Sequence, residues 1–330
     1  MRSLSAVILA VVFAAAAAHA ADDPKVPKKK DDPSQIGNRE TGKCLNFYSI
    51  DKEIAMGKQL AEEVVRQVKT NDDALLGEYV NRVGQNLVRN SDAKVPFTFR
   101  VIEDESPNAF ALPGGFIFVN TGLIKIASEE DEFAGAVAHE IAHVAARHMT
   151  CRATKGQIAN ILSMPLGMIL GGWTGYAVRQ GAGVGVQTLF SSFSRADETE
   201  ADYLGVQYMY ATGYDPNGAV SIFEKLEALQ RTKPGLAARV FGSHPMDAQR
   251  IDRTQKEIQR ILPSKPEYVV STSEYHDMRE RLIESQNRPK SDDTDGRPHL
   301  RVAPGTGKPD DPGSDKDERP TIRRRELMEE

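Results

Sequence analysis

The run His139-Glu140-Ile141-Ala142-His143 restricts the fold of this chain more than any other feature. On a helix, residues four apart lie on one face, so both imidazoles can reach one metal ion while Glu140 lies beside them. The pattern is typical of a zinc site that carries its general base in the same helical turn. The surrounding residues are apolar or small, which predicts a buried helix.

The start of this helix is also marked in the sequence. Ser128 is followed by Glu129, Glu130 and Asp131. Serine is a favourable N-cap residue, and acidic side chains in the first turn stabilise the helix dipole. We therefore expect the helix to begin directly after Ser128.

The first twenty residues have the pattern of a secretory signal peptide. Arg2 precedes an uncharged run from Leu4 to Ala18, and Ala18-His19-Ala20 is a small-x-small cleavage site. The apolar run is shorter than the ~20 residues that a membrane span needs, which argues against an N-terminal anchor. We expect an exported protein, located in the periplasm if the cell is Gram-negative.

Composition excludes one class of partner and leaves one covalent feature open. The chain has 42 basic and 47 acidic residues and a net charge of -5, so we expect no nucleic-acid partner. Its two cysteines, Cys44 and Cys151, are too few for a disulfide scaffold. They can form one bridge in an oxidising compartment, or Cys151 can be a small buried apolar residue. The sequence does not specify an oligomeric state.

The chain divides into a leader, one folded domain and a tail. Residues 21–44 are rich in Lys, Asp and Pro and predict a disordered leader after the signal peptide at 1–20. Residues 288–330 have a similar composition and predict a disordered charged tail. The folded domain is expected over 45–287.

Within that domain the periodicity predicts an α+β fold that is mainly α-helical. Residues 97–101 alternate as a strand, and 109–112 and 116–119 predict a hairpin around Pro113-Gly114-Gly115. We expect these strands to form a small antiparallel sheet beside the helix of the motif. Helical spacing predicts further helices at 51–69, 72–90, 195–211, 215–229, 246–262 and 273–286.

The predicted hairpin allows two interpretations. An extended polypeptide substrate can add to the sheet edge as one more strand, held by main-chain hydrogen bonds. Alternatively, Pro113-Gly114-Gly115 is only a turn between two core strands.

Residues 156–194 form an apolar, glycine-rich insertion with Arg179 as their single charge. The uncharged run from Gly156 to Val178 is long enough to span a bilayer if it is helical. Pro165 and several glycines argue against a span. We favour a helical hairpin near the metal site over a transmembrane segment. This hairpin is either buried or in contact with a membrane surface through 156–194.

Two histidines do not complete a catalytic zinc site, because such zinc normally has three protein ligands. One large class has a third histidine six residues after the second, but here that position is Met149. His148 points to a different helix face and is expected to be an exposed helix-end residue. Glu198 and Asp202 lie one turn apart, so one can bind metal while the other hydrogen-bonds a ligand imidazole. The alternative is a solvated acidic helix face.

With these residues in place, the chain resembles the HtpX-like zinc metallopeptidases, the family of the CAAX prenyl endopeptidases and of periplasmic chaperone-proteases. The resemblance covers roughly Phe47 to Leu262. Its motifs are His139-Glu140-x-x-His143, Ser194-Arg195 with Glu198-x-x-Ala201-Asp202, Gly57-Lys58-Gln59-Leu60-Ala61, Asn108-Ala109-Phe110 with Pro113-Gly114-Gly115, and Ser243-His244-Pro245 with Arg250.

The resemblance implies a role for each matching residue. Zn2+, one per chain, is bound by His139, His143 and Glu198, and Asp202 hydrogen-bonds a ligand. Asn108 lies in the cleft near the substrate strand. His244 approaches the metal, where it either stabilises the oxyanion or covers the zinc in a resting form. The periplasmic relatives carry helical repeats after the protease domain, whereas this chain ends in its charged tail.

The implied fold is a zincin-type metalloprotease domain with glutamate as the third ligand. The implied reaction is peptide hydrolysis by a zinc metalloendopeptidase, with Glu140 as general base and then general acid. Misfolded or membrane-associated proteins are the expected substrates, in protein quality control. The alternative is a zinc-bearing chaperone or binding protein of the cell envelope with little protease activity. The intact Glu140 argues against that alternative, because a binding role does not need it.

Overall fold

The three strands form a small mixed sheet in the order β1-β3-β2. A computed structural model describes residues 29–163, 193–232, 244 and 248–287, and the elements and contacts given below are those of these residues. β2 (Ala109–Leu112) and β3 (Phe116–Asn120) are the predicted antiparallel hairpin, while β1 (Thr98–Ile102) lies parallel to β3. The expected sheet was wholly antiparallel. The difference arises because β1 pairs with the second hairpin strand rather than with the first.

The hairpin turn depends on two glycines. Gly114 and Gly115 have φ angles of 74° and 92°, which side chains with a Cβ rarely adopt. An added Cβ at Gly114 would also lie 2.5 Å from the Cα of Ile54, on the helix that precedes the sheet. The turn is therefore fixed both by its backbone conformation and by close packing.

Two amphipathic helices precede the sheet, as the sequence predicts. α2 (Ile50–Gln67) begins after the N-cap Ser49 and packs on β2 and β3. α3 (Ala74–Arg89) begins after Asp73, whose carboxylate accepts from the N–H groups of Leu75 and Leu76, and packs on β1. These contacts bury one side of each helix against the sheet.

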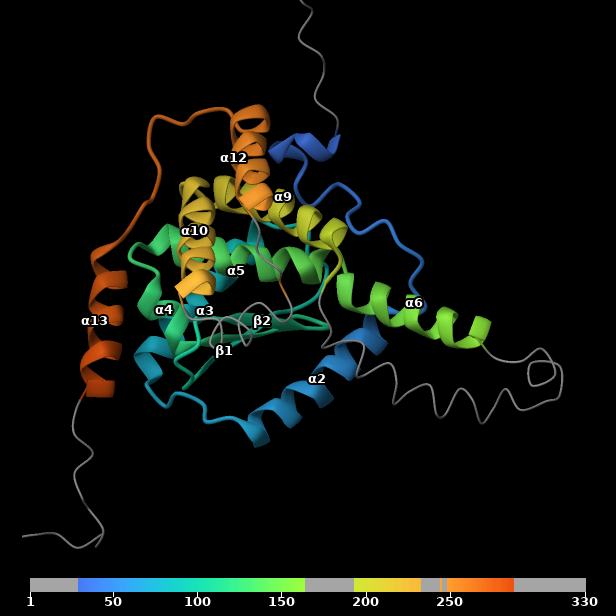
Figure 1. Cartoon of the computed structure of the whole chain (residues 1–330), viewed down its shortest axis with the longest axis horizontal. Helices are drawn as coiled ribbons and strands as arrows, with labels where there is room; N and C mark the ends of the chain where they lie inside the picture. Colours follow the sequence, from blue (N-terminus) through green and yellow to red (C-terminus); the bar gives the residue numbers. More distant parts are fainter. Residues whose placement is uncertain (1–28, 164–192, 233–243, 245–247, 288–330) are drawn as a thin grey trace, which may run out of the picture. The chain divides into compact units, whose positions relative to one another are not determined.

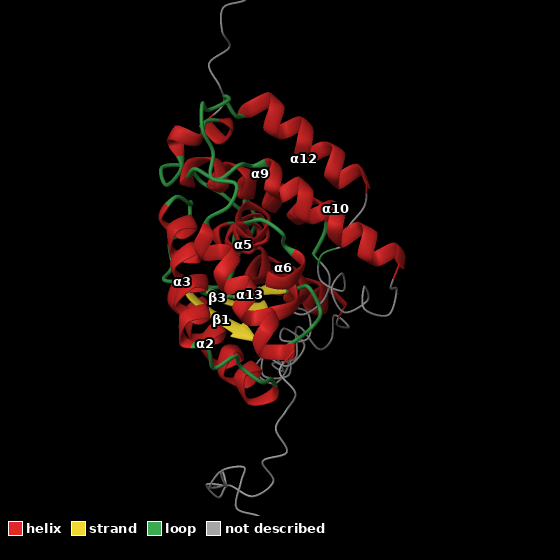
Figure 2. Ribbon diagram, turned by 90° about the vertical axis from the view of Figure 1, so that its left-hand side faces the viewer, coloured by secondary structure: helices red, strands yellow, loops and turns green. Residues whose placement is uncertain are grey.

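The central helix is α5 (Glu130–Ala145), which follows the short α4 (Thr121–Ile126). α5 contacts β2 below and helices α9 (Arg195–Thr212) and α10 (Asn217–Thr232) above, so it lies between the sheet and a helical layer (Figures 1 and 2). Nearly all its residues are buried. The predicted buried helix is confirmed.

The N-terminus of α5 differs from the expectation. Ser128 does not cap the helix, since the N-cap is Glu129 and makes no side-chain capping bond. Instead, the backbone N–H of Ser128 donates to the carboxylate of Glu132 at 2.6 Å. Lys225 of α10 donates to the same carboxylate at 2.6 Å, so this end of α5 is held by its neighbour rather than by a serine cap.

The remaining described α-helices are α6 (His148–Ser163), α12 (Ala248–Ile261) and α13 (Ser273–Asn287). α12 packs on α9 and α10, and α13 packs on α3 and α4. The largest fully buried side chains come from these layers and from the sheet, namely Tyr208, Tyr275, Phe118, Phe133, Leu76, Leu87, Ile117, Leu123, Ile124, Ile141, Met209 and Ile222.

The segment before α2 is ordered over residues 29–44, where we expected disorder. It forms the 3-10 turns η2 (Lys29–Asp31) and η3 (Pro33–Gln35). Its polar composition does not prevent burial, because Arg39 is paired with the buried Asp92 at 2.8 Å. Cys44 and Cys151 form a disulfide that ties the segment to α6, with Cα atoms 5.9 Å apart.

Three predictions concern residues outside the described ranges: the signal peptide at 1–20, most of the insertion at 156–194, and the tail at 288–330. The compact unit that contains every described element ends at Asn287. Among the described helices, none combines the length and apolar character that crossing a bilayer requires.

Candidate metal centre

Helix α5 presents the two motif histidines on one buried face. The Nε2 atoms of His139 and His143 lie 3.0 Å apart, and both side chains are almost fully buried. The rings meet at 77°, so their nitrogens converge while the ring planes do not stack. Both Nε2 atoms therefore point to one position.

Helix α9 brings Glu198 to that position. Ser194 and Asp197 form a reciprocal capping box that starts α9, so Glu198 falls in its first turn. The carboxylate oxygens of Glu198 lie 3.4 Å from Nε2 of His139 and 3.4 Å from Nε2 of His143. Gly205 lets the two helices approach, since a Cβ there would lie 3.3 Å from the backbone nitrogen of His139. The predicted acidic residues face the site rather than solvent.

Asp202 and Arg250 support the ligand cluster from behind. The carboxylate of Asp202 lies 3.0 Å from Nδ1 of His139. Arg250 of α12 donates through Nε to Asp202 at 2.6 Å, and its Nη1 lies 2.6 Å from Glu198. The sequence marked Arg250 only as part of a motif. In the structure Arg250 forms ion pairs with Glu198 and Asp202, and so holds both acidic side chains beside the histidines.

His244 lies within the ligand cluster, although it is far from the motif in sequence. Its Nδ1 is 3.0 Å from Glu198 and 3.2 Å from Nε2 of His139, and its Nε2 is 3.4 Å from the carboxylate of Glu140. The side chain is buried. The structure therefore brings His244 to the metal position, where the sequence leaves two roles open for it.

The donor set fits a zinc ion. One nitrogen or oxygen from each of His139, His143, Glu198 and His244 lies within 4.8 Å of the others. Ligands about 2.0–2.1 Å from a tetrahedral zinc stand about 3.3–3.4 Å apart. Every donor pair except His143 with His244 is separated by 3.0–3.4 Å, which is close to that value. Imidazole nitrogen and carboxylate oxygen are also ligands that zinc accepts.

Burial and charge set the protonation of these side chains. Burial lowers the pKa of His143 well below its ordinary value, which favours the neutral form that binds metal. Burial alone would raise the pKa of Glu198, but His244 and hydrogen bonds from His139 and His143 hold it well below its usual range. Burial and Arg250 lower the pKa of His139, yet Asp202 and Glu198 outweigh them and raise it to about 9.

Glu140 is anchored to the sheet edge. Its carboxylate accepts a hydrogen bond from the backbone N–H of Ala111 in β2 at 2.9 Å, and burial raises its pKa. Glu140 and His244 line a cavity of about 50 Å³ together with Asn108, Phe223 and Arg250. The structure thus brings Asn108 to the same cleft as His139, Glu140 and His244.

His148 is not the exposed residue that we expected. It is 2% exposed, and its Nδ1 lies 3.0 Å from Nδ1 of His143. The prediction was wrong because it continued α5 past His143 as one straight helix. The chain instead turns at Arg147, which has a φ of 57°, and α6 begins at His148. No simple sequence signal marks a non-glycine residue for that conformation.

Comparisons with known proteins agree with this geometry. The sequence profile described as peptidase family M48 matches residues 74–258. The chain is 29% identical over 245 residues to the beta-barrel assembly-enhancing protease of Yersinia pestis, covering 71% of this chain and 49% of that protein. It is 30% identical over 251 residues to the mitochondrial metalloendopeptidase OMA1 of Schizosaccharomyces pombe, covering 73% and 69%.

The Escherichia coli K12 beta-barrel assembly-enhancing protease is 29% identical over 235 residues, covering 68% of this chain and 47% of that protein. The chain therefore spans about half the length of the beta-barrel assembly-enhancing proteases that it matches.

Proposed function

Because the chain belongs to peptidase family M48, a family of zinc metallopeptidases, we propose that it is an exported zinc-dependent endopeptidase. The observation that carries the proposal is the convergence of His139, His143 and Glu198 on one position, with Glu140 beside it. The proposed substrates are misfolded or membrane-associated proteins, in protein quality control. The names of two relatives, a beta-barrel assembly-enhancing protease and a metalloendopeptidase, support this class.

The reaction needs an activated water and a group that moves its proton. When bound by His139, His143 and Glu198, zinc would supply a Lewis acid that activates water and polarises the scissile carbonyl. Glu140 takes the proton of the attacking water and delivers it to the departing amine. The raised pKa of Glu140 suits a group that must both accept and release a proton. Asp202 holds the ring of His139 through Nδ1.

His244 is proposed to cover the site in a resting form. Its Nδ1 stands among the donor atoms, so four protein ligands would leave no position for water. Substrate hydrolysis then requires His244 to leave the cluster.

The substrate is proposed to bind as an added strand along β2. The backbone N–H of Ala111 donates to Glu140 and so points away from β3. Because backbone groups alternate between the two edges of a strand, those of Ala109 share this open edge. Asn108 stands at the start of this edge and lines the cleft that contains Glu140. A peptide on this edge would therefore pass the catalytic carboxylate.

Export is supported by the signal-peptide pattern and by the disulfide between Cys44 and Cys151, since disulfides persist in oxidising compartments. In a Gram-negative cell the proposed location is the periplasm. Contact of residues 156–194 with a membrane surface remains part of the proposal.

The test compares zinc content and casein cleavage of the wild type, Glu140→Gln and Glu198→Ala. Glu140→Gln should keep one zinc per chain and lose about 10²–10⁴-fold in cleavage rate. Glu198→Ala should lose zinc. Glu63→Gln on the exposed face of α2 is the matched control and should behave as wild type. Cleavage by Glu140→Gln at the wild-type rate would refute the proposal. If cells that carry this variant keep the biological effect of the protein, the alternative function as a zinc-bearing chaperone is favoured.

A further inference from the structure

The two motif histidines are held by different partners behind the metal position. Nδ1 of His139 faces the carboxylate of Asp202, a common arrangement for a metal-binding imidazole. Nδ1 of His143 instead faces another imidazole, that of His148, at 3.0 Å. Beyond it, Nε2 of His148 lies 3.3 Å from the carboxylate of Glu200. A line of three side chains thus runs from the metal position outward.

The hydrogen bonds along this line have only one consistent direction for neutral rings. His143 must leave Nε2 unprotonated to bind metal, so its proton is on Nδ1 and donates to Nδ1 of His148. His148 then carries its own proton on Nε2 and donates it to Glu200. Glu200 accepts this hydrogen bond through one of its two carboxylate oxygens.

Glu200 is itself held from two sides. Its second carboxylate oxygen accepts the backbone N–H of Gly42 at 3.0 Å. Gly42 has a φ of 65°, and a Cβ there would lie 1.8 Å from the carbonyl oxygen of Ala146, so the segment is pressed against the end of α5. The disulfide at Cys44 fixes the same segment to α6. Glu200 therefore has little freedom to turn away from His148.

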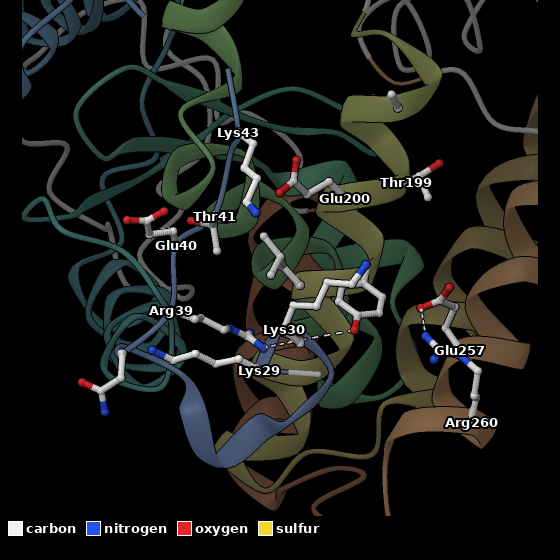
Figure 3. A pocket seen from close by; sticks show the side chains of 14 residues that line it. Lys29, Lys30, Arg39, Glu40, Thr41, Lys43, Thr199, Glu200, Glu257 and Arg260 are labelled. Carbon is white, nitrogen blue, oxygen red and sulfur yellow. Dashed lines mark hydrogen bonds and ion pairs between the residues drawn. The ribbon is translucent and has the colours of Figure 1, made fainter. Parts of the chain in front are cut away.

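Glu200 also connects the line to solvent. Its side chain is 38% exposed and lines an open cavity of about 1010 Å³ that Figure 3 shows together with Lys43 and Thr199. The metal position is buried, but the outer end of the line is accessible.

The turn at Arg147 places His148 in this line. A non-glycine residue with positive φ costs about 1 kcal/mol or more and persists only where its surroundings hold it. Arg147 donates to the buried carboxylate of Glu53 at 2.7 Å and to the carbonyl oxygen of Tyr48 at 2.6 Å. These bonds hold the turn that aims His148 back at His143 instead of outward.

We propose that His148 and Glu200 are positioning residues that fix the ring orientation and the tautomer of His143 for metal binding. The proposal rests on the metal site assigned above. It extends that site by two residues that contact neither metal nor substrate, and it assigns a purpose to the unusual conformation of Arg147.

The experiment measures zinc affinity by competition with a chelator, and the visible absorption spectrum of the Co2+-loaded protein, for substitutions of His148. His148→Phe keeps the ring and removes both hydrogen bonds, so zinc affinity should fall about 10–100-fold. His148→Asn keeps an acceptor near the position of Nδ1 and should retain most of the affinity. His148→Gln moves its polar group toward the position of Nε2 and should bind zinc less tightly than His148→Asn. Relative to wild type, the cobalt spectrum should change most in His148→Phe, less in His148→Gln and least in His148→Asn.

Glu200→Ala should also weaken zinc binding, by less than His148→Phe. Glu257→Ala is its matched control, because Glu257 lines the same cavity without contacting His148. His276→Phe is the control for the histidine series, since His276 is exposed on α13. Both controls should bind zinc as tightly as wild type.

The outcomes separate the two proposals. A folded wild type that binds no zinc overturns the metal site and the positioning role together. A wild type that binds zinc, with His148→Phe equal to it in affinity and cobalt spectrum, overturns the positioning role alone. If His148→Phe does not fold, the test compares the zinc affinities of His148→Asn and His148→Gln. Equal zinc affinities of these two variants would contradict the proposal.

Discussion

The carboxylate of Glu140 accepts a hydrogen bond from the backbone N–H of Ala111 at 2.9 Å, which links the motif helix to the edge strand of the sheet. The group proposed as general base and the strand proposed to bind substrate are therefore in direct contact. A peptide that added along β2 would approach the same N–H. The position of the base and the position of the substrate are set by one backbone segment.

Removing this N–H should misplace the base without removing the metal ligands. Ala111→Pro lacks the donor, and proline is tolerated on an edge where the ladder does not use the N–H. A displacement of about 1 Å in such a group can cost about 10²-fold in rate. We expect a loss of that order in casein cleavage with one zinc retained. Wild-type cleavage by the proline variant would show that the contact has no role.

His244→Ala should increase cleavage. If His244 covers the metal position in about nine molecules of ten, the cleavage rate is lowered about tenfold. Removing the imidazole should therefore raise the rate by about tenfold. The measurement is the rate of casein cleavage at saturating zinc. A rate below wild type with zinc retained would instead assign His244 to stabilisation of the oxyanion, contrary to the resting cover.

Arg250→Ala should destabilise the metal-free protein strongly. The substitution leaves Glu198 and Asp202 buried without their guanidinium partner. Removing one member of a buried charge network costs about 3–5 kcal/mol. Denaturant unfolding in the presence of a chelator measures this cost. Arg260→Ala is the control, since Arg260 is largely exposed and its pairs should contribute about 0–1 kcal/mol.

Asp131 should give the protein a stability that falls as pH rises. Burial raises its pKa from the ordinary 3.8 to about 7, assisted by the nearby carboxylates of Asp215 and Glu132. Between these values the folded state binds more protons than the unfolded state, so the contribution present below pH 3.8 is lost as pH rises through about 7.

Asp131→Asn should remove this pH dependence. At pH 8 its free energy of unfolding, measured with denaturant, should exceed that of wild type by on the order of 2 kcal/mol. The two proteins should converge near pH 4. Asp252→Asn, at an exposed position on α12, should leave the pH profile unchanged. Parallel profiles of wild type and Asp131→Asn from pH 4 to 8 would contradict the assignment.

Local patterns predicted much of the fold and of the site. Helical spacing gave α2 and α3 to within a few residues, because each buries one continuous face. The strand pattern and Pro113-Gly114-Gly115 gave the hairpin, since turn residues carry their own backbone preference. Helical spacing predicted that His139 and His143 share a face and that one residue of the acidic pair on α9 can join them, because spacing on a helix determines which side chains lie together. The choice of Glu198 and the place of His244 came from the family resemblance.

Features that depend on distant contacts were not predictable. Arg39 is buried only because Asp92, in another segment, supplies its counter-charge. The composition of residues 29–44 therefore predicts a disordered leader, although in the structure they pack on the core. Similarly, His148 contacts His143 only because Glu53 and Tyr48 stabilise the turn at Arg147. The parallel pairing of β1 depends on which hairpin strand it meets, and no local pattern specifies that.

The disulfide between Cys44 and Cys151 joins two residues that are 107 positions apart in the sequence. The loop that it closes contains the whole sheet, His139 and His143. Glu198 and His244 lie beyond that loop. A metal ion bound by all four would join the covalently closed part of the chain to the part that the sulfur bond does not reach. Disulfide formation and metal binding would then constrain two successive stretches of the chain, the first by a covalent bond and the second by coordination.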